Sequence, residues 1–189
     1  VLHRAAERLA HQFTGMVNAE TVERVVFESY TALVRTATVS THLPSLAEKF
    51  SRDRLTALAQ SRGLIAKPVP EILYVCVQNS GRSQMAAAIT RHLAGDRVHV
   101  RSAGSQPGAG ILPGVIEVLA EAGIEVNEEF PKPLTDYVVR AAGAVVTMGC
   151  GDACPFYPGK RYLDWQLDDP ADLDLDGIRH VRDEIRRHV

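Results

Sequence analysis

Apolar positions in the first third of the chain recur every three or four residues, which is the spacing of amphipathic helices. One set falls on a single helical face and stops at a Thr-Gly pair: Leu2, Ala5, Leu9 and Phe13. Asn18, a residue type that caps helix N-termini, precedes a second set that runs from Val22 to Ala37. We therefore predict two successive helices in this region.

A third helix is predicted from Pro44 to Gly63, because proline is favoured in the first turn of a helix and glycine directly after its end. The apolar stripe of this segment changes face midway along it. We therefore expect a break at Ser51, where the hydroxyl group would cap a second helical piece. Three short helices can bury one common face, so a small helical bundle is predicted.

The pattern changes after residues 63–70, a stretch with two prolines that is typical of a linker. Strands are predicted for the apolar runs at residues 72–75, 98–100, 144–148 and 161–163. Helices are predicted to begin at Ser83, Pro113 and Asp176. Near-continuous apolar strands separated by helices indicate an α/β fold with a parallel four-stranded sheet flanked by helices. The predicted domains are an N-terminal helical bundle, residues 1–66, and an α/β domain, residues 67–189.

Composition and charge narrow the function classes. The formal net charge of −2 argues against broad binding to nucleic acid or to acidic membranes. We find no apolar run near the ~20 residues that a membrane span needs, and no secretory signal, so a cytoplasmic protein is expected. Three cysteines are an odd number and few for the length, which favours reactive thiols over a disulfide-stapled fold. The seven histidines show no paired metal spacing, so no metal site is predicted.

A candidate oxyanion loop lies where the first predicted strand ends and its helix begins. Small residues let such a loop curl so that its backbone N–H groups point at one centre, and the helix N-terminus adds partial positive charge. Arg82 can hold two oxygens of a tetrahedral anion with its forked guanidinium. The predicted substrate-binding loop consists of Cys76, Val77, Gln78, Asn79, Ser80, Gly81, Arg82 and Ser83.

The positive potential of this loop would also favour the thiolate of Cys76, which is the nucleophilic form of cysteine. The alternative is that Cys76 is a small buried hydrophobe at the end of a strand. A bare Cys-x5-Arg pattern is weak, but its position and the small residues inside it favour a nucleophile. The glycine-rich stretch from Gly104 to Gly110 lacks the lysine of a nucleotide site and is interpreted as a flexible rim loop.

These residues resemble the low-molecular-weight tyrosine phosphatase superfamily, whose signature is Cys-x5-Arg-Ser after the first strand. The run Asn-Ser-Gly-Arg-Ser-Gln-Met-Ala at residues 79–86 is similar to the arsenate reductase branch of that superfamily. The likeness continues through residues 102–104, 146–150 and 168–170 and covers residues 71–189. It implies a phosphatase-like fold and reduction of arsenate to arsenite, with arsenate as the oxyanion substrate.

The resemblance also implies a general acid, because the superfamily uses an Asp that directly precedes a Pro in a late loop. Asp169-Pro170 matches this pattern, and proline biases its predecessor toward an extended backbone that helps to aim the carboxylate. The surrounding loop is rich in aspartate, so a solvated acidic loop is the alternative interpretation, with Asp168 as the alternative acid.

Cys150 and Cys154 supply two thiols that a phosphatase would not need. Cys150 follows the predicted strand at 144–148, so it should emerge at the same sheet edge as Cys76. A zinc half-site and a pair of inert core thiols are the other interpretations, and zinc would require ligands that this spacing does not offer. We interpret the two residues as a redox pair.

Resemblance to thioredoxin-coupled arsenate reductases then implies a relay that passes from Cys76 to Cys150 and to Cys154. No cofactor is expected to stay bound, and thioredoxin would supply the reducing equivalents, with mycothiol and mycoredoxin as the alternative donor. Ala87 stands where many relatives have Glu, which argues against their potassium site. The spacing between the last two cysteines is also shorter than in some relatives.

The N-terminal helices resemble extensions found on some actinobacterial arsenate reductases. A DNA-reading helix-turn-helix is an alternative, but basic residues only modestly outnumber acidic ones there, so we expect homodimerisation or docking rather than nucleic-acid binding. Two other functions remain open from the sequence. One is a low-molecular-weight protein tyrosine phosphatase that hydrolyses phosphate monoesters, and the other is an anion- or redox-sensing module without turnover.

Overall fold

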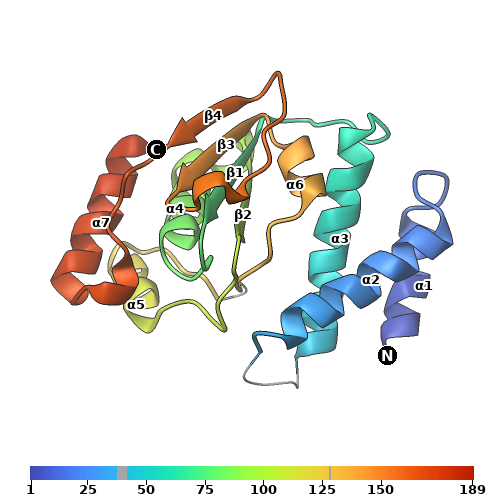
Figure 1. Ribbon diagram of the computed structural model, residues 1–189, viewed down its shortest axis with the longest axis horizontal. Coiled ribbons are helices and arrows are strands. Elements are labelled where there is room, and N and C mark those ends of the chain that lie inside the picture. The colour runs from blue at the N-terminus through green and yellow to red at the C-terminus, as the bar shows by residue number, and fades with distance from the viewer. Residues whose placement is uncertain (38–41, 128) are drawn as a thin grey trace. The chain divides into compact units, whose positions relative to one another are not determined.

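The computed structural model describes residues 1–37, 42–127 and 129–189, and for Asp152 its backbone alone. The chain forms two compact units (Figure 1). The first contains Val1–Lys67 and Thr135–Ala141, and the second contains Pro68–Leu134 and Ala142–Val189. Within the described part of the chain, every helix is too short or too polar to cross a bilayer.

The first unit is built from helices α1 (Leu2–Gln12), α2 (Ala19–Val34), α3 (Leu43–Ser61) and α6 (Asp136–Ala141). Asn18 caps α2 as predicted, because its side chain accepts a hydrogen bond from the backbone N–H of Thr21 at 2.8 Å. The core of this unit is formed by apolar faces that include fully buried Leu9, Val22 and Leu55.

The expected break at Ser51 is wrong, because α3 runs through this residue without interruption. The Ser51 hydroxyl donates to the carbonyl of Ala47, four residues back, at 2.6 Å, and so stays inside the helix instead of capping a new one. The apolar stripe changes face because α3 packs against three other helices, α1, α2 and α6, and therefore buries more than one side.

Helix α6 is an element that the hydrophobic pattern did not reveal. It lies far along the chain, between residues of the second unit, yet it packs against α3 in the first. Tyr137 joins the apolar core there, and its ring lies 5.7 Å from the guanidinium carbon of Arg54. The N-terminal bundle thus gains a fourth, short helix, while the division into domains at residues 66 and 67 stays a prediction about independent folding.

The second unit contains the predicted parallel sheet, with strand order β2-β1-β3-β4. Its strands are β1 (Glu71–Cys76), β2 (His99–Gly104), β3 (Ala144–Met148) and β4 (Arg161–Asp164). The register places Cys76, the last residue of β1, between Gly104 and Met148. Three strands therefore end together at one sheet edge, where open α/β sheets bind ligands.

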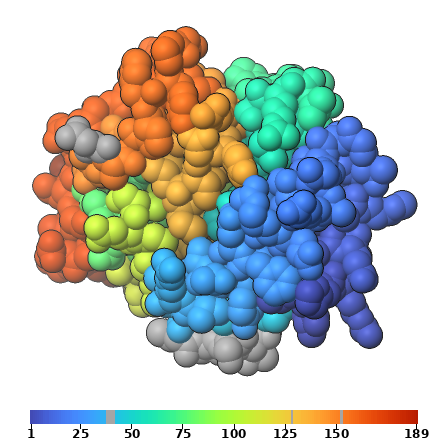
Figure 2. All heavy atoms as spheres, turned by 45° about the vertical axis from the view of Figure 1, so that its right-hand side comes forward, coloured from blue at the N-terminus to red at the C-terminus, as the bar shows by residue number. Residues whose placement is uncertain are grey.

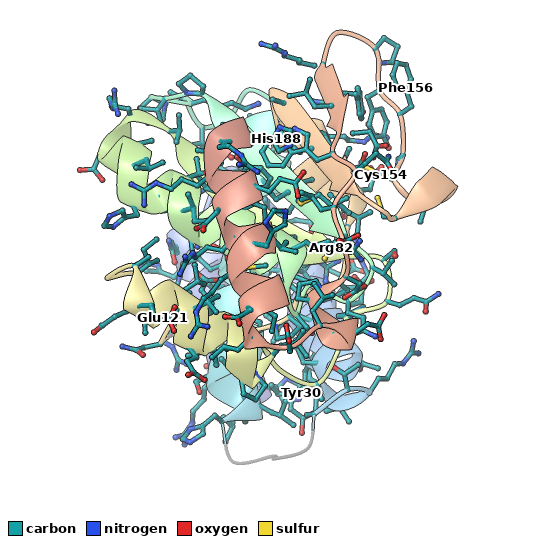
Figure 3. All side chains as sticks on the ribbon, turned by 90° about the vertical axis from the view of Figure 1, so that its left-hand side faces the viewer. Tyr30, Arg82, Glu121, Cys154, Phe156 and His188 are labelled. Carbon is teal, nitrogen blue, oxygen red and sulfur yellow. The ribbon has the colours of Figure 1, made fainter. Side chains whose placement is uncertain are left out.

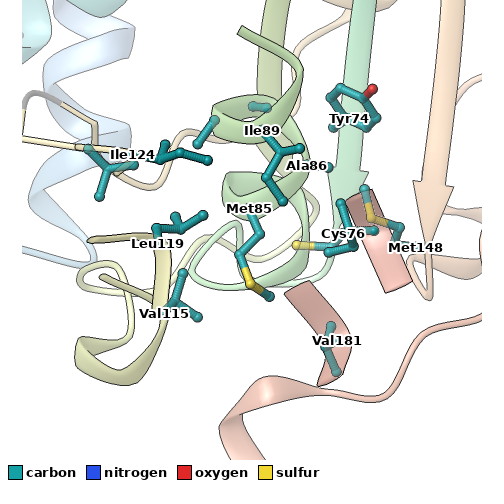
Figure 4. Close-up of a cluster of buried hydrophobic side chains, with 14 of the residues drawn as sticks. Tyr74, Cys76, Met85, Ala86, Ile89, Val115, Leu119, Ile124, Met148 and Val181 are labelled. Atoms are coloured by element: carbon teal, nitrogen blue, oxygen red, sulfur yellow. The ribbon is translucent and has the colours of Figure 1, made fainter. Parts of the chain in front are cut away.

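Helices α4 (Arg82–Ala94), α5 (Pro113–Glu121) and α7 (Leu175–His188) cover one face of this sheet. Figure 4 shows Met85, Leu119 and Val181 from these helices in the apolar cluster that also contains Cys76 and Met148 from the strand ends. Burial of such side chains stabilises by about 1.5–3 kcal/mol each relative to exposure. The residues that begin the oxyanion loop are thus attached to a close-packed core.

Three short 3-10 helices complete the second unit. They are η1 (Gly95–Arg97), η2 (Gly151–Ala153) and η3 (Pro170–Asp172). The second of them lies between the two later cysteines, and the third follows the predicted general acid, so both belong to the loops that border the sheet edge.

Candidate active site

The loop from Cys76 to Gly81 turns its carbonyl groups outward. The acceptor carbonyls and their donors are Cys76 with Ser105 N–H (3.1 Å), Val77 with Gln106 (2.8 Å), Gln78 with Gly108 (2.8 Å) and Ser80 with Leu112 (2.9 Å). In a trans peptide the N–H of the next residue points the opposite way, and no peptide bond here is cis. The N–H groups of residues 77, 78, 79 and 81 are therefore directed into the loop, where they can bind an anion.

Residues 104–110, interpreted from the sequence as a flexible rim loop, are held to the oxyanion loop at several points, through the N–H groups of Ser105, Gln106 and Gly108. Its glycines allow the close approach. A Cβ atom at Gly104 would lie 2.6 Å from the Val77 carbonyl oxygen, and one at Gly108 would lie 2.5 Å from the Ser80 hydroxyl oxygen. Two glycines four residues apart after a strand were the available signal for this contact.

Asn79 supports the nucleophile from inside the loop. It has a φ of 50°, in the left-handed region, and its N–H lies 3.2 Å from the Cys76 sulfur. Its side-chain NH2 donates to the Ser83 hydroxyl at 2.7 Å, and that hydroxyl lies 2.9 Å from the same sulfur. Its side-chain oxygen accepts from the side chain of Gln84 (3.2 Å) and the backbone N–H of Lys132 (2.9 Å).

Cys76 is 2% exposed, and it is one of the residues that line a small pocket. The pocket is lined by Cys76, Gln78, Ser80, Gly81, Arg82, Leu112 and Asp169. Three of the predicted loop residues do not line the pocket: Val77, Asn79 and Ser83. Asn79 and Ser83 are nevertheless part of the site, because the Ser83 hydroxyl contacts the Cys76 sulfur and is itself bonded by Asn79.

Arg82 and Asp169 meet at the pocket. One guanidinium nitrogen, Nη2, lies 2.8 Å from the carboxylate of Asp169, and the other, Nη1, donates to the carbonyl of Leu167 at 3.2 Å. The Asp169 carboxylate also accepts from the N–H of Ala171, which caps the 3-10 helix η3 and fixes the side chain in place. Asp168, the alternative acid, is not among the described residues that line the pocket.

Gly149 provides the space for this arginine. Its φ is 76°, and a Cβ atom there would lie 3.0 Å from Nη1 of Arg82. A side chain at this position would be strained in its backbone and would press on the guanidinium. The sequence placed this glycine in the run at residues 146–150 that resembles the family, but it gave no sign of the contact with Arg82, which is 67 residues away.

Cys150 and Cys154 border the same site. Cys150 is buried two residues beyond β3, and Cys154 is half-buried at the end of η2; all three cysteines are free thiols. Burial raises the pKa of Cys150, and negative charge at Cys76 and Asp164 raises it further. Burial raises the pKa of Cys154 to about 11, with a further contribution from Cys150. The strand register places Met148 beside Cys76, so Cys150 follows two residues after a direct neighbour of the nucleophile, and Figure 3 shows Cys154 in the same loop.

Two features of the site bear on the expectation from the sequence that a potassium site is absent. Both lone pairs of the Asn79 side-chain oxygen are used by N–H donors, and Ala87 presents only a buried methyl group. Among the described residues, His, Cys, Asp and Glu nowhere gather in threes that could hold a metal ion.

Comparison with known proteins identifies the family. Residues 71–189 match the model of the low molecular weight phosphotyrosine protein phosphatases. The chain belongs to this family. Residues 2–59 also match a model described as the protein-tyrosine-phosphatase-like N-terminal domain, so the helical extension is itself a recurrent unit in this phosphatase-like family.

Several relatives of this phosphatase-family chain carry the name arsenate reductase. Arsenate reductase 1 of Staphylococcus epidermidis is 35% identical over 122 residues, which cover 62% of this chain and 91% of that protein. The arsenate reductase of Halalkalibacterium halodurans is 34% identical over 128 residues, with coverage of 62% and 91%. The structure of a thioredoxin-dependent arsenate reductase from Corynebacterium glutamicum is 51% identical, with a TM-score of 0.91, and the match covers 99% of this chain and 94% of that one.

Proposed function

We propose that this protein reduces arsenate to arsenite through its three cysteines and is regenerated by thioredoxin. The observation that carries the proposal is that two further free thiols, Cys150 and Cys154, follow strand β3, whose last residue pairs with Cys76 at the anion pocket. Hydrolysis of a phosphate ester would need only the pocket and an acid. The arsenate reductases among the relatives support the same chemistry.

In the first step the Cys76 thiolate attacks arsenic while the inward N–H groups and Arg82 hold the equatorial oxygens. A sulfur–arsenic bond forms and one arsenic–oxygen bond breaks. Asp169 donates a proton to the departing oxygen, which leaves as water or hydroxide according to the protonation of the bound arsenate. A tetrahedral anion in the pocket would compete with Asp169 for Arg82. This competition would free the carboxyl group of Asp169 from the ion pair, so that it could face the leaving oxygen.

In the second step the Cys150 thiolate attacks the Cys76 sulfur. The sulfur–arsenic bond breaks, its electron pair passes to arsenic, and arsenic(V) leaves as arsenic(III), while a Cys76–Cys150 disulfide forms. Cys154 then attacks the Cys150 sulfur and releases Cys76 as a thiolate. Two electrons and two protons from the thioredoxin dithiol reduce the remaining Cys150–Cys154 disulfide and complete the cycle.

The test is arsenate-dependent consumption of NADPH in the presence of thioredoxin and thioredoxin reductase. We expect Cys76→Ser to abolish turnover. Cys154→Ser should release about one arsenite per chain and then stop with Cys76 and Cys150 joined as a disulfide, detectable by mass spectrometry. Sustained multiple turnover by Cys154→Ser would contradict the relay. Parallel assays with mycothiol and mycoredoxin would identify the alternative donor.

Phosphate-monoester hydrolysis is the second candidate, because the family match and the Cys76–Arg82–Asp169 pocket suit it equally well. Aryl-phosphate hydrolysis that survives the loss of Cys150 and Cys154, without arsenate turnover, would favour this phosphatase function. Inactivity in both assays would favour the anion- or redox-sensing module.

We also propose that residues 1–66 and 67–189 act as separate domains in a cytoplasmic protein, and that the N-terminal helices join two copies of the chain. Phe27 and Val34 on α2 are 36% and 44% exposed, and side chains of this helix reach the surface drawn in Figure 2. Apolar side chains of this size on an outer helix face support an association surface. Sedimentation velocity of the protein beside Phe27→Ser/Val34→Ser tests this, because a monomeric parent would contradict it.

A further inference from the structure

The turn that follows Cys154 is held to strand β4 by the side chain of Tyr162. The phenol oxygen accepts a hydrogen bond from the backbone N–H of Tyr157 (2.8 Å) and donates one to the carbonyl of Pro155 (3.2 Å). One hydroxyl group therefore holds the backbone both before and after Phe156. The backbone of Tyr162 is in turn fixed by the parallel pairing of β4 with β3.

The ring of Tyr162 makes a second contact with the same turn. It lies 4.7 Å from the ring of Phe156 between centroids, at an interplanar angle of 30°. Phe156 is 73% exposed and lies at the outer end of the loop in Figure 3. Because Phe156 is open to water, burial of this ring contributes little, and the hydroxyl bonds of Tyr162 to the backbone are the main contacts that hold the turn.

The other end of the cysteine segment has a different backbone. Gly149 and Gly151 flank Cys150, and both have positive φ values, 76° and 56°. Glycine adopts this conformation, and leaves it, at little steric cost. A Cβ atom at Gly151 would meet nothing within 4 Å, so the described surroundings leave room there. The two glycines therefore lower the steric cost of a backbone change around Cys150, whereas the backbone after Cys154 is bonded to the side chain of Tyr162 in β4.

We propose that Tyr162 is a positioning residue for the resolving thiol: it holds Cys154 in place while Cys150 moves between its two sulfur partners. This inference rests on the proposed three-cysteine relay. Cys150 has to bond first to Cys76 and then to Cys154, so at least one sulfur must travel. A fixed Cys154 makes the second encounter an intramolecular reaction with a well-placed target.

Tyr162 exchanges no electrons in this step. The Cys154 thiolate attacks the Cys150 sulfur, a Cys150–Cys154 bond forms, and the Cys76–Cys150 bond breaks with its electron pair on Cys76. Burial raises the pKa of Tyr162, and negative charge at Cys154 raises it further. The phenol therefore keeps its proton while Cys154 is ionised, and its bond to the Pro155 carbonyl persists through the attack.

Tyr162→Phe tests the proposal, because it keeps the ring contact with Phe156 and removes only the hydroxyl bonds. Tyr30→Phe, which deletes a hydroxyl group from α2, is the matched control. In a single turnover with equimolar arsenate, acid quenching, alkylation and mass spectrometry give the amounts of arsenite, of Cys76–Cys150 and of Cys150–Cys154 over time.

We expect Tyr162→Phe to release arsenite within about twofold of the parent rate. It should convert Cys76–Cys150 to Cys150–Cys154 about five- to tenfold more slowly, the effect of losing one or two hydrogen bonds. Excess dithiothreitol, which reduces Cys76–Cys150 directly, should restore its steady-state turnover to that of the parent. Tyr30→Phe should match the parent in every measurement.

Equal conversion rates in Tyr162→Phe and the parent would overturn the inference, and so would an equal slowing of arsenite release and of disulfide conversion, which marks a general structural defect. Tyr162→Leu, checked by circular dichroism, should slow the conversion at least as much. If the parent itself forms no arsenite, it is the proposed function that fails, so the two failures are distinguishable.

Discussion

At the scale of single residues, the site depends on atoms that lie around the nucleophile rather than on the nucleophile alone. The Cys76 sulfur is surrounded by the N–H of Asn79 and the hydroxyl of Ser83, and Asn79 is held by groups from two further segments. Such a network is strong when every member is satisfied and costly when one is removed. Asn79 is therefore where structure and chemistry are most closely coupled.

Asn79→Ala should lower the free energy of unfolding by about 2–4 kcal/mol, because Gln84 and Lys132 lose an acceptor and alanine is strained at positive φ. Urea denaturation measures the change. Asn79→Gly is the matched control, because it loses the same side-chain bonds but adopts a φ of 50° without strain. The absence of strain should favour its folded state by about 1 kcal/mol over that of Asn79→Ala. The greater entropy of glycine in the unfolded chain offsets part of this difference. An unchanged unfolding midpoint in Asn79→Ala would refute the role of this network.

Arg82→Lys keeps the positive charge and removes the planar fork. We expect kcat/KM for arsenate to fall by about 100-fold or more, because an ammonium group cannot hold two oxygens and the Leu167 carbonyl at once. Steady-state kinetics with thioredoxin measure this effect. Arg161→Lys, at an exposed position in β4, should leave kcat/KM unchanged. Near-parent activity in Arg82→Lys would mean that charge alone binds the substrate.

The sequence predicted those residues of the site that lie next to one another in the chain or beside a marker residue. Cys76 to Ser83 are consecutive, and Asp169 is marked by the proline after it, so a linear pattern contains them. The contacts of Lys132 with Asn79 and of Gly149 with Arg82 could not be predicted, because they join residues that are far apart in the sequence. No linear spacing encodes such a contact.

At the scale of elements, the loop between β3 and β4 has to serve two demands. It must keep Cys150 close to Cys76 and then deliver it to Cys154, although both thiols are held in their protonated forms by burial. Because the nucleophile in thiol exchange is the thiolate, protonation of the resolving cysteine limits how fast the loop can finish the relay.

This leads to a pH dependence for the resolving step. A pKa of about 11 for Cys154 means that its thiolate fraction rises about tenfold per pH unit at neutral pH, and the rate of Cys150–Cys154 formation should rise with it. Quenched single-turnover experiments from about pH 6.5 to 8.5 measure this rate separately from arsenite release. Cys154→Ser provides the baseline, and a rate that does not change with pH would show that Cys154 ionises more readily than its burial implies.

Most elements were predictable, since all four strands and the α-helices of the second unit follow from the spacing of apolar residues and from the glycines and prolines between them, whereas the three 3-10 helices were not predicted. The two misses among the α-helices have one cause. The unbroken α3 and the unnoticed α6 pack against each other, and a helix buried on several sides does not show the single apolar stripe that an amphipathic pattern requires.

At the scale of the whole molecule, the chain does not divide cleanly into an early and a late part. It leaves the second unit after Leu134, contributes α6 to the first, and returns at Ala142. The helical unit therefore includes residues that lie in the middle of the reductase sequence. A boundary drawn from composition at residue 66 omits this contribution.

The stability of the N-terminal helices should therefore respond to a change at Tyr137. Its ring packs against their core and lies near Arg54, so Tyr137→Ala should destabilise the first unit by about 2–3 kcal/mol, less than for a fully buried aromatic residue because Tyr137 is only partly buried. Native-state hydrogen exchange should show faster exchange in α2 and α3, with smaller changes in β1 and β3. Tyr137→Phe, which keeps the ring, should lose much less. Uniform acceleration over both units would show that they unfold as one, and unchanged exchange in α3 would show that α6 contributes nothing to the bundle.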